Sequence, residues 1–273
     1  MSENQQEKAK RLHALHAAPG IFVIANAWDG GSARILAGLG FKALATSSGA
    51  CAATLGRVDG KVTRDEALAH ARTIVAATDC PVAADLEKGF GDSPEVVAQT
   101  IRLAAGVGLV GGSIEDAQGD GNALYDIGHA TERVAAAAEA ARALPFPFTL
   151  TARAENFIRG NPDLDDTIGR LRAFEGAGAD VLFAPGLPDL AAIRAVCAAV
   201  SRPVNFMVGI RGKSFTIADL AAAGVKRISL ATSLYRAAVT GLLEAAREVR
   251  DEGTFEYVEG AMTTAELNRF LQT

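Results

Sequence analysis

Acidic residues and one arginine stand where the short apolar runs of this chain end. They are Asp85, Glu87, Glu115, Asp116 and Arg153. The carboxyl ends of parallel strands gather at one face of a barrel, so we expect these side chains to share one mouth. Four carboxylates in one mouth repel one another and raise one another's pKa unless a cation lies among them.

Oxygen ligands without histidine or cysteine favour a hard cation. We therefore predict a site for Mg2+, with Mn2+ as its substitute, formed by Asp85, Glu87 and Glu115. Asp85 and Glu87 alternate along an extended chain, so both face inward only if the chain bends, which Gly89 and Gly91 would permit. A structural ion pair is the alternative for any one of these acids, but the set at successive strand ends favours a functional site.

A substrate anion has candidate partners at the same mouth. Arg153 offers a planar, two-pronged donor to a carboxylate. Ser47, Ser48 and Gly49 follow the second apolar run and offer hydroxyl and backbone N–H groups to the same anion. Trp28, just past the first run, is a further substrate-binding candidate.

A long segment rich in Gly and Ala, residues 48–61, carries Asp59. Long loops at this end of a barrel commonly close over the active site. We predict that Asp59 enters the site on closure; a plain surface charge is the alternative. The ligand implied by all these groups is a small acid that chelates Mg2+ through carboxylate and keto oxygens.

Eight short runs have the pattern of strands. They cover residues 21–26, 43–47, 81–85, 109–116, 148–154, 180–185, 203–208 and 226–231. Each is too short for a helix, and several are apolar on both faces, which is typical of parallel strands covered on both sides.

Segments with helical period alternate with these runs. Thr63 with Glu66 predicts a capping box, and Ser93 before Pro94 predicts a helix start. Eight strand–helix units favour an α/β fold, a (β/α)8 TIM barrel, over an open doubly wound sheet. The open sheet is the alternative, because periodicity does not show closure.

The ends of the chain add to this plan. Further helices are expected at about residues 4–17 and 263–272, outside the eight strand–helix units. No linker interrupts the pattern, so we predict one barrel domain, residues 1–273.

The composition excludes several classes of protein. The chain has 273 residues, 49% of them hydrophobic, and its charge sums to 27 − 32 = −5 with the four histidines neutral. No run of Lys and Arg with interleaved aromatics suggests a nucleic-acid surface, and no 18-residue apolar stretch suggests a membrane span. Three scattered cysteines, Cys51, Cys80 and Cys197, and a polar N-terminus without an apolar signal segment predict a cytoplasmic protein.

Other reactive residue types are not expected to take part in chemistry. None of His13, His16, His70 and His129 falls at a predicted strand end, so a histidine base or a His-rich metal site is disfavoured. Cys51 has no partner base in the sequence around it and is expected to be a small buried hydrophobe.

Six motifs resemble the isocitrate lyase/phosphoenolpyruvate mutase superfamily. They are NAWDGGSA (26–33), TSSGACAATLGRVDG (46–60), ADLEKGFG (84–91), SIEDA (113–117), TARAENFIRG (151–160) and GADVLFAPG (178–186). The resemblance implies enzymes that form or cleave C–C or P–C bonds beside an α-keto or α-hydroxy carboxylate, through a Mg2+-held enolate. It also implies a barrel that swaps its last helix between subunits, and hence a homo-oligomer, a dimer or tetramer.

The resemblance also implies roles for single residues. Asp85 resembles the direct Mg2+ ligand. Ser47, Ser48 and Gly49 resemble the turn around the substrate carboxylate, and Arg153 resembles the arginine beside it. The acids that resemble holders of the metal's waters are Glu87, Glu115 and Asp59. The family usually has Asp where this chain has Glu, at position 87, and the longer side chain keeps the charge.

The loop after the fourth run departs from the family. Lyase members carry a Lys–Cys–Gly–His motif there, with the cysteine as general acid, whereas this chain has AQGDGNALYDIGH. Isocitrate or methylisocitrate cleavage by that mechanism is therefore disfavoured. Mutase members place Lys and Asn in this loop for the phosphoryl group; Asn122 is a candidate for the Asn, but the loop contains no lysine.

We therefore predict a Mg2+-dependent carbon–carbon lyase that acts on a small α-keto or α-hydroxy (di)carboxylate, for example by decarboxylating oxaloacetate. Its predicted catalytic residues are Asp59, Glu115 and Arg153. The first alternative is a phosphonopyruvate-type P–C bond hydrolase or mutase on the same site. The second is a barrel that binds an α-keto acid without turning it over.

Overall fold

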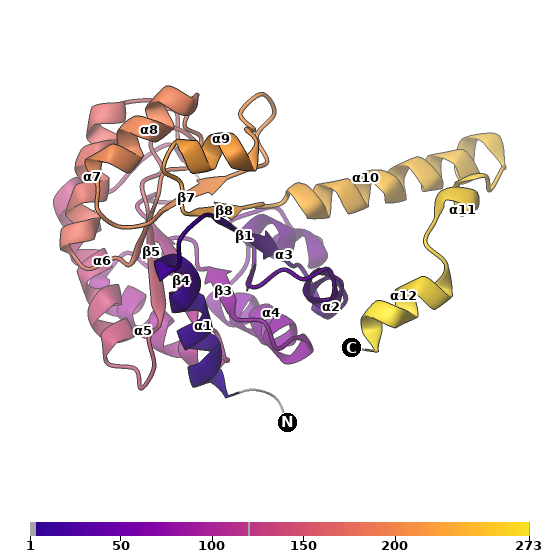
Figure 1. Cartoon of the computed structure of the whole chain (residues 1–273), viewed down its shortest axis with the longest axis horizontal. Helices are drawn as coiled ribbons and strands as arrows, with labels where there is room; N and C mark the ends of the chain where they lie inside the picture. Colours follow the sequence, from indigo (N-terminus) through magenta and orange to yellow (C-terminus); the bar gives the residue numbers. More distant parts are fainter. Residues whose placement is uncertain (1–3, 120, 273) are drawn as a thin grey trace.

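The computed structural model describes residues 4–119 and 121–272 and closes eight parallel strands into a barrel (Figure 1). Each strand pairs with the next along the chain, and the last pairs with the first, so the sheet has no free edge. The strands are β1 (Phe22–Asn26), β2 (Leu44–Ala45), β3 (Val82–Asp85), β4 (Gly111–Glu115), β5 (Thr149–Arg153), β6 (Val181–Phe183), β7 (Val204–Met207) and β8 (Arg227–Ser229). The (β/α)8 prediction is confirmed, and the open sheet is excluded.

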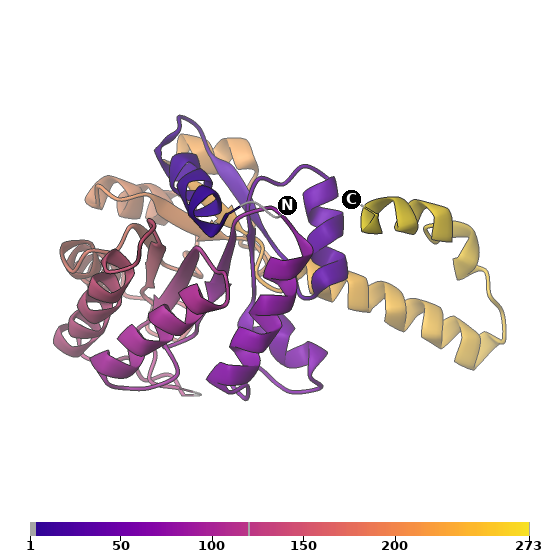
Figure 2. The same ribbon diagram turned by 90° about the horizontal axis from the view of Figure 1, so that it is seen from below.

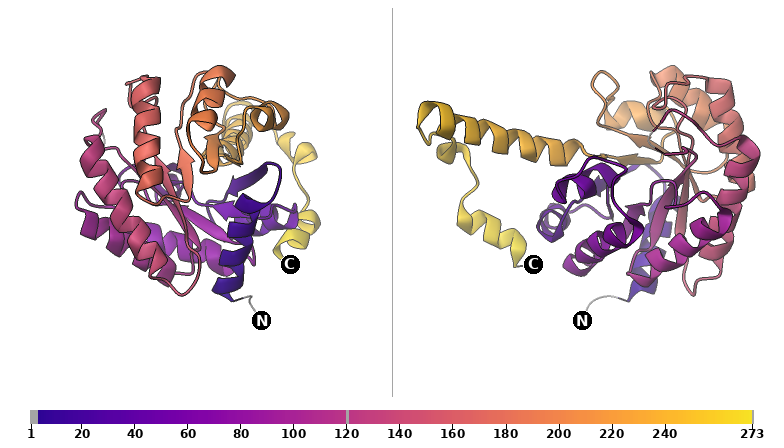
Figure 3. Two further views of the ribbon diagram at one scale, coloured as in Figure 1. Left: turned by 60° about the vertical axis from the view of Figure 1, so that its left-hand side comes forward. Right: turned by 180° about the vertical axis from the view of Figure 1, so that it is seen from behind.

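Helices connect the strands and surround the barrel, and further helices precede β1 and follow β8 (Figure 3). They are α1 (Gln5–Ala17), α2 (Gly30–Gly38), α3 (Ser48–Thr54), α4 (Arg64–Ala77), α5 (Pro94–Gly106), α6 (Ile127–Arg142), α7 (Leu164–Gly176), α8 (Leu190–Ala199), α9 (Ile217–Ala222), α10 (Ser233–Arg247), α11 (Tyr257–Gly260) and α12 (Thr264–Leu271). The predicted terminal helices correspond to α1 and α12. Within the described residues, no helix combines the length and apolar character needed to cross a bilayer.

Local side-chain chemistry fixes several helix starts. Thr63 and Glu66 form the predicted capping box at α4, where each side chain accepts a hydrogen bond from the other's backbone N–H. Ser93 caps α5, with Pro94 in the first turn. Such caps satisfy backbone N–H groups that the first helical turn leaves without partners, which is why the sequence signal located these boundaries.

The barrel interior keeps open space toward its carboxyl-terminal mouth. Small residues such as Ala45, Ala83 and Gly112 line a central cavity, where barrels are generally filled by branched apolar side chains. At the opposite end, Ala9 and Leu12 of α1 join a buried cluster with residues of the barrel strands. Helix α1 therefore closes the amino-terminal end, and ligands have access from the mouth.

Helix α10 leaves the barrel instead of packing on it (Figures 1 and 2). None of its residues is buried. After a short π-helix, η1 (Glu248–Glu252), the chain turns back so that α12 lies against α2, where Arg34 donates a hydrogen bond of 2.6 Å to the carbonyl of Leu271. We call residues 233–272 the C-terminal arm. Its exposed large apolar side chains are Leu242, Leu243, Val249, Phe255, Tyr257, Val258, Met262 and Leu267.

Candidate active site

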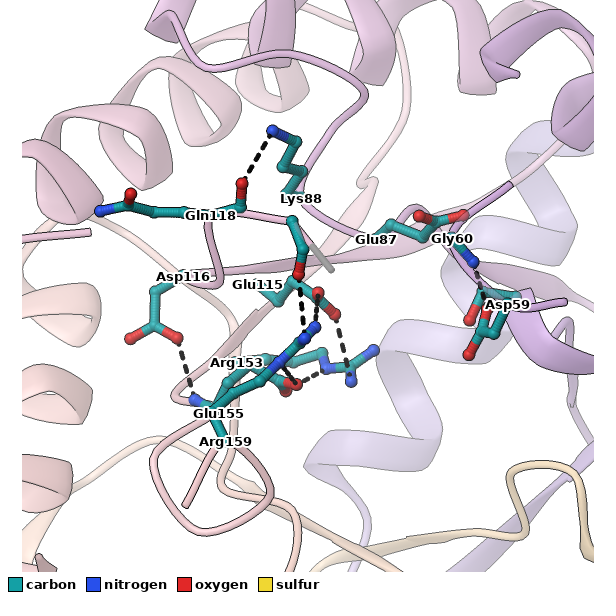
Figure 4. Close-up of polar contacts among 12 residues, drawn as sticks. Asp59, Gly60, Glu87, Lys88, Glu115, Asp116, Gln118, Arg153, Glu155 and Arg159 are labelled. Atoms are coloured by element: carbon teal, nitrogen blue, oxygen red, sulfur yellow. Dashed lines mark hydrogen bonds and ion pairs between the residues drawn. The ribbon is translucent and has the colours of Figure 1, made fainter. Parts of the chain in front are cut away.

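Arg153, the last residue of β5, is the centre of a charged cluster at the barrel mouth (Figure 4). Its Nη1 lies 2.9 Å from Asp85 Oδ1, and its Nη2 lies 3.2 Å from Glu115 Oε2. Its Nε donates to Glu155 Oε1 at 2.9 Å. Arg159, in the segment after β5, adds a second cation 3.2 Å from Glu115 Oε1. The strand ends therefore bring Asp85, Glu115 and Arg153 together.

Asp116, which the sequence also placed at the mouth, has a different environment. Its Oδ2 lies 3.0 Å from Arg170 Nη1 of α7, and its Oδ1 accepts a hydrogen bond of 2.9 Å from the backbone of Glu155. Asp116 and Arg170 are both buried, and their pair joins α7 to the segment after β4, while the hydrogen bond from Glu155 adds the segment after β5. The prediction that Asp116 lies among the mouth carboxylates is wrong.

Glu87 reaches the mouth through a bend in its own backbone. Its φ is +49°, in the left-handed region, and its N–H donates to Asp85 Oδ1 at 3.2 Å. The expected bend therefore lies at Glu87 itself as well as at Gly89, which has φ of +84°. A positive φ in a residue with a side chain costs free energy and is concentrated at functional sites.

Two carboxyls of the mouth, those of Glu87 and Glu115, have raised pKa values. Burial, together with Asp85, Asp59 and Glu115, raises the pKa of Glu87 to about 8. Burial also raises the pKa of Glu115 to about 8, against the lowering effect of Arg153. Within the described residues, Glu87 takes part in no ion pair. Glu87 is thus a half-buried carboxyl that lies near other acids and forms no ion pair with a described residue.

This donor set fits a hard cation such as Mg2+, which prefers carboxylate oxygens. In the present arrangement Arg153 stands between Asp85 and Glu115. Across residues 4–119 and 121–272, no three Asp, Glu, His or Cys side chains are close enough together to share one ion. Coordination by Asp85 and Glu115 together therefore requires Arg153 to give up at least one of its contacts.

Two cavities meet at Arg153, which lines both of them. The inner cavity has a volume of about 90 Å³ and extends into the barrel from Asp85 and Ser47. The outer cavity has a volume of about 470 Å³ and is lined by loop residues. Among them are Ser48, Asp59, Glu87, Glu115 and Arg159. The predicted site residues thus divide between a chamber inside the barrel and one under the loops.

The predicted substrate turn is the start of helix α3. Ser47 caps this helix, since its Oγ accepts a hydrogen bond of 3.4 Å from Ala50 N–H. Ser48 N–H donates to Asp85 Oδ2 at 3.3 Å. A Cβ atom at Gly49 would lie 3.2 Å from Asp59 Oδ2, so the glycine permits the approach of that acid. Asp59 therefore does reach the mouth, as the sequence predicted.

Two of the predicted substrate-binding residues lie apart from the others. The Trp28 ring packs edge-on against Tyr235, with 5.6 Å between ring centroids. Asn122 is exposed, on the loop after β4. Neither residue lines the inner or the outer cavity. Their roles in substrate binding stay predictions that require movement of these segments.

Residues that the sequence analysis did not assign also shape the site. Glu155 and Arg159 flank Arg153 and Glu115 in space. The sequence did contain a signal for these two residues. An acid and an arginine four residues apart can face one another across a helical turn, and this pair directly follows a predicted strand. Arg227 and Asn205 line the inner cavity from β8 and β7. Arg227 follows Lys226 at the start of the run 226–231, so its place within a predicted strand was the available signal.

The stability of the ion-free protein should fall as pH rises through about 8, because Glu87 must then ionise among like charges. Its folded-state pKa of about 8 lies above the ordinary value of 4.5, so this group stabilises the fold at low pH and loses that contribution as pH rises through 8. Thermal unfolding from pH 6 to 9 in EDTA would show this fall. We expect Glu87→Gln to make this fall smaller, with Glu115 causing the part that remains, and we expect Mg2+ to restore stability at high pH.

Glu139→Gln, on the exposed side of α6, is the matched control and should leave the pH profile of unfolding unchanged. If Glu87→Gln unfolds with the same pH profile as the wild type, Glu87 is not held in a like-charge cluster.

Comparison with known proteins identifies the family. The family model for phosphoenolpyruvate phosphomutase matches residues 12–250. The chain belongs to the isocitrate lyase/phosphoenolpyruvate mutase superfamily. The resemblance based on the six sequence motifs is therefore confirmed.

Members of this superfamily with similar structures or sequences have several activities. A Burkholderia cenocepacia J2315 protein proposed to be a lyase or mutase is 51% identical, with a TM-score of 0.96 over 98% of each chain. The 2-methylisocitrate lyase of Halalkalibacterium halodurans is 29% identical over 97% of this chain and 90% of the lyase. The oxaloacetate decarboxylase of Bradyrhizobium diazoefficiens is 27% identical over 96% of this chain and 91% of that enzyme. A solved complex of oxaloacetate acetylhydrolase with its product oxalate is 25% identical, with a TM-score of 0.89 over 98% of this chain and 95% of that one.

Three of these four relatives are named for small carboxylic acids, and their names give different reactions. Membership therefore accounts for the barrel and for a lyase of this superfamily, whereas the substrate and the bond that this chain acts on have to be argued from its own residues.

Proposed function

We propose that this protein is a Mg2+-dependent lyase that cleaves a C–C bond of a small α-keto or α-hydroxy dicarboxylate, with oxaloacetate decarboxylation as the leading case. The observation that carries the proposal is the cluster of Asp85, Glu87 and Glu115 around Arg153, in which Glu87 takes part in no ion pair within residues 4–119 and 121–272. The named decarboxylase and the oxalate complex among its relatives support the same substrate class.

Asp85 would hold the ion directly, Glu87 and Glu115 would hold its waters, and Asp59 would approach it from the loop before α4. Bound Mg2+ would act as a Lewis acid that polarises the substrate carbonyl and stabilises enolate charge. Arg153 would turn its guanidinium from Asp85 toward a substrate carboxylate, for which its paired donors are suited. Manganese, which accepts the same oxygen ligands, would serve as substitute.

The chain also has a group that can hold a proton beside the reacting carbon. Glu115 is buried, and burial raises its pKa above the ordinary value even beside Arg153, so this carboxyl takes up a proton more readily than an exposed one. We assign to Glu115 and Asp59 the delivery of the proton that the product enolate needs. The loop after β4 has no cysteine in the described chain, so the proton has to come from another group.

A second candidate acts on the P–C bond of a phosphonopyruvate-like substrate. Lys88 and Arg159 line the outer cavity and could face a phosphonate, and the matching family model is named for a phosphomutase. Incubation with oxaloacetate and with phosphonopyruvate, each with Mg2+, separates the candidates. Pyruvate from oxaloacetate supports the lyase, whereas phosphate or phosphoenolpyruvate from phosphonopyruvate supports the second candidate. Binding without product from either would favour the non-catalytic alternative.

We also propose that the C-terminal arm joins subunits of a homo-oligomer. An unpacked helix with exposed Leu242 and Leu243 is an apolar surface of the kind that partner subunits cover. We expect the full chain to elute as a dimer or tetramer in light-scattering chromatography. Leu242→Lys with Leu243→Lys should reduce its mass toward that of a monomer.

The matched control places lysines at Leu103 and Ile217, exposed apolar residues outside the arm, and should keep the oligomer. A monomeric wild-type chain, or an oligomer that survives the arm substitutions, would contradict the proposal.

A further inference from the structure

Arg227 places a buried positive charge inside the barrel. It begins β8, is 6% exposed, and lines the inner cavity together with Asp85 and Arg153. Its Nε donates to Asn205 Oδ1 at 2.7 Å, and its Nη2 donates to Thr151 Oγ1 at 3.0 Å. These contacts hold the guanidinium against the inner wall of the cavity.

The contacts of Arg227 are all with neutral groups. Its Nη1 lies 3.3 Å from His16 Nε2, and burial lowers the pKa of His16 to about 3, so the ring is uncharged. His16 Nδ1 lies 2.9 Å from the Leu12 carbonyl and must donate to it, which leaves Nε2 as the acceptor for Arg227. Asn205 is oriented in a similar way, because its Nδ2 donates to Ser229 Oγ at 3.0 Å.

Within the described chain, Arg227 has no acidic partner within 4.0 Å, and burial alone lowers its pKa to about 9. Buried arginines are ordinarily paired with acids, because an isolated charge in the interior is costly. Arg153 and Arg170 follow that rule, at 2.9 Å from Asp85 and 3.0 Å from Asp116. Buried Arg133 instead donates to the backbone carbonyls of Glu115 and Gly91. The inner cavity therefore presents a fixed cation whose counter-charge is not supplied by the described protein.

The cavity beside Arg227 has the size and the position for an anionic group. Its volume of about 90 Å³ exceeds the space that one water molecule needs. Thr151 and Arg153 are two residues apart on β5, about 7 Å along the strand. Arg227, which contacts Thr151, and Arg153 therefore line the same cavity from two levels of β5, and the rise between these levels is on the scale of a short dicarboxylate.

We propose that Arg227, with Asn205 and Ser229, binds the second carboxylate of the substrate inside the barrel while Arg153 holds the first. This inference rests on the proposed function and narrows it to short dicarboxylates. It predicts that discrimination between mono- and dicarboxylates depends on Arg227, a residue of the barrel interior, rather than on the loops around the mouth.

Calorimetric binding of L-malate and of pyruvate, each with Mg2+, tests the proposal. We expect the wild type to bind malate more tightly than pyruvate, and Arg227→Met to weaken malate binding about 10- to 100-fold, as the loss of a charged hydrogen bond does. Pyruvate affinity should stay within about twofold, which also shows that the variant is folded. Arg227→Lys should give an intermediate result, and Arg172→Met, on the exposed side of α7, should change neither affinity.

Equal weakening of both ligands, or unchanged malate binding, in Arg227→Met would overturn the subsite. Acetate serves as a probe for a separate anion site. If acetate binds the wild type without Mg2+, fails to bind Arg227→Met and is not displaced by malate, then Arg227 belongs to such a separate site, and the dicarboxylate subsite is also overturned. If neither malate nor pyruvate binds the wild type with Mg2+, the proposed function itself fails, and that outcome is visible before any variant is made.

Discussion

Replacement of Asp85 by alanine should reduce Mg2+-dependent turnover to the rate without enzyme, a loss of about 10³-fold or more in a reaction that depends on metal-ion charge stabilisation. Asp85 ends β3, and its two oxygens contact Arg153 Nη1 and Ser48 N–H. Asp85 therefore contacts both Arg153 and the start of α3, and it is the proposed ligand of the ion. Steady-state rates over a range of Mg2+ concentrations, with the substrate that the wild type turns over, would measure the effect.

A graded series makes the Asp85 result specific. We expect Glu87→Gln to lose about 10- to 100-fold in metal affinity or activity, as is common for residues that support a metal ligand. Asp65→Ala, an exposed acid in the first turn of α4, should change neither. Full activity in Asp85→Ala would remove the metal site from the mechanism.

Replacement of Arg153 by methionine should have the second largest effect, and it should act on both stability and catalysis. The substitution leaves Asp85, Glu115 and Glu155 facing one another without their central cation. Breaking a buried ion pair costs about 3–5 kcal/mol of unfolding free energy, and losing an oriented donor to the reacting substrate costs about 10²–10³-fold in kcat/KM. Urea unfolding and steady-state kinetics would measure the two losses separately.

Two further variants separate charge from geometry at Arg153. Arg153→Lys keeps the charge, but one ammonium cannot reproduce the planar fork that contacts three acids, so we expect stability to recover more than kcat/KM does. Arg159→Met removes the outer cation and leaves Glu115 paired with Arg153, so its effect should be smaller than that of Arg153→Met. An Arg153→Met protein with wild-type kcat/KM would show that this arginine does not handle substrate.

Local patterns predicted the barrel well because its elements are defined locally. Apolar runs located all eight strands, and the capping chemistry of Thr63 and Ser93 located two helix starts. The convergence of Asp85, Glu115 and Arg153 followed from strand ends alone, since parallel strands of a closed barrel end at one mouth.

The features that were missed depend on long-range packing. The amphipathic pattern of α10 is the same whether its apolar face packs on its own barrel or on another surface, so the sequence did not show that it leaves the barrel. The left-handed backbone of Glu87 has no signal in a residue type that seldom adopts it. Asp116 was misplaced because its partner, Arg170, is distant in the sequence.

The sequence also did not show which buried arginine has acidic partners inside the barrel. The sequence contains Arg153 at the end of one predicted strand and Arg227 near the start of another. Only the three-dimensional arrangement shows that the first is surrounded by acids and that the second contacts only neutral groups.

The most direct test of the central claim is to identify by NMR the products that the purified wild-type protein forms. The substrates are oxaloacetate and a panel of α-keto and α-hydroxy dicarboxylates, each incubated once with Mg2+ and once with EDTA. We predict C–C cleavage of at least one dicarboxylate, with pyruvate as the product from oxaloacetate, at a rate well above the enzyme-free control, and its loss in EDTA. Turnover that persists unchanged in EDTA, or phosphonopyruvate as the sole substrate consumed, would contradict a magnesium-dependent carbon–carbon lyase.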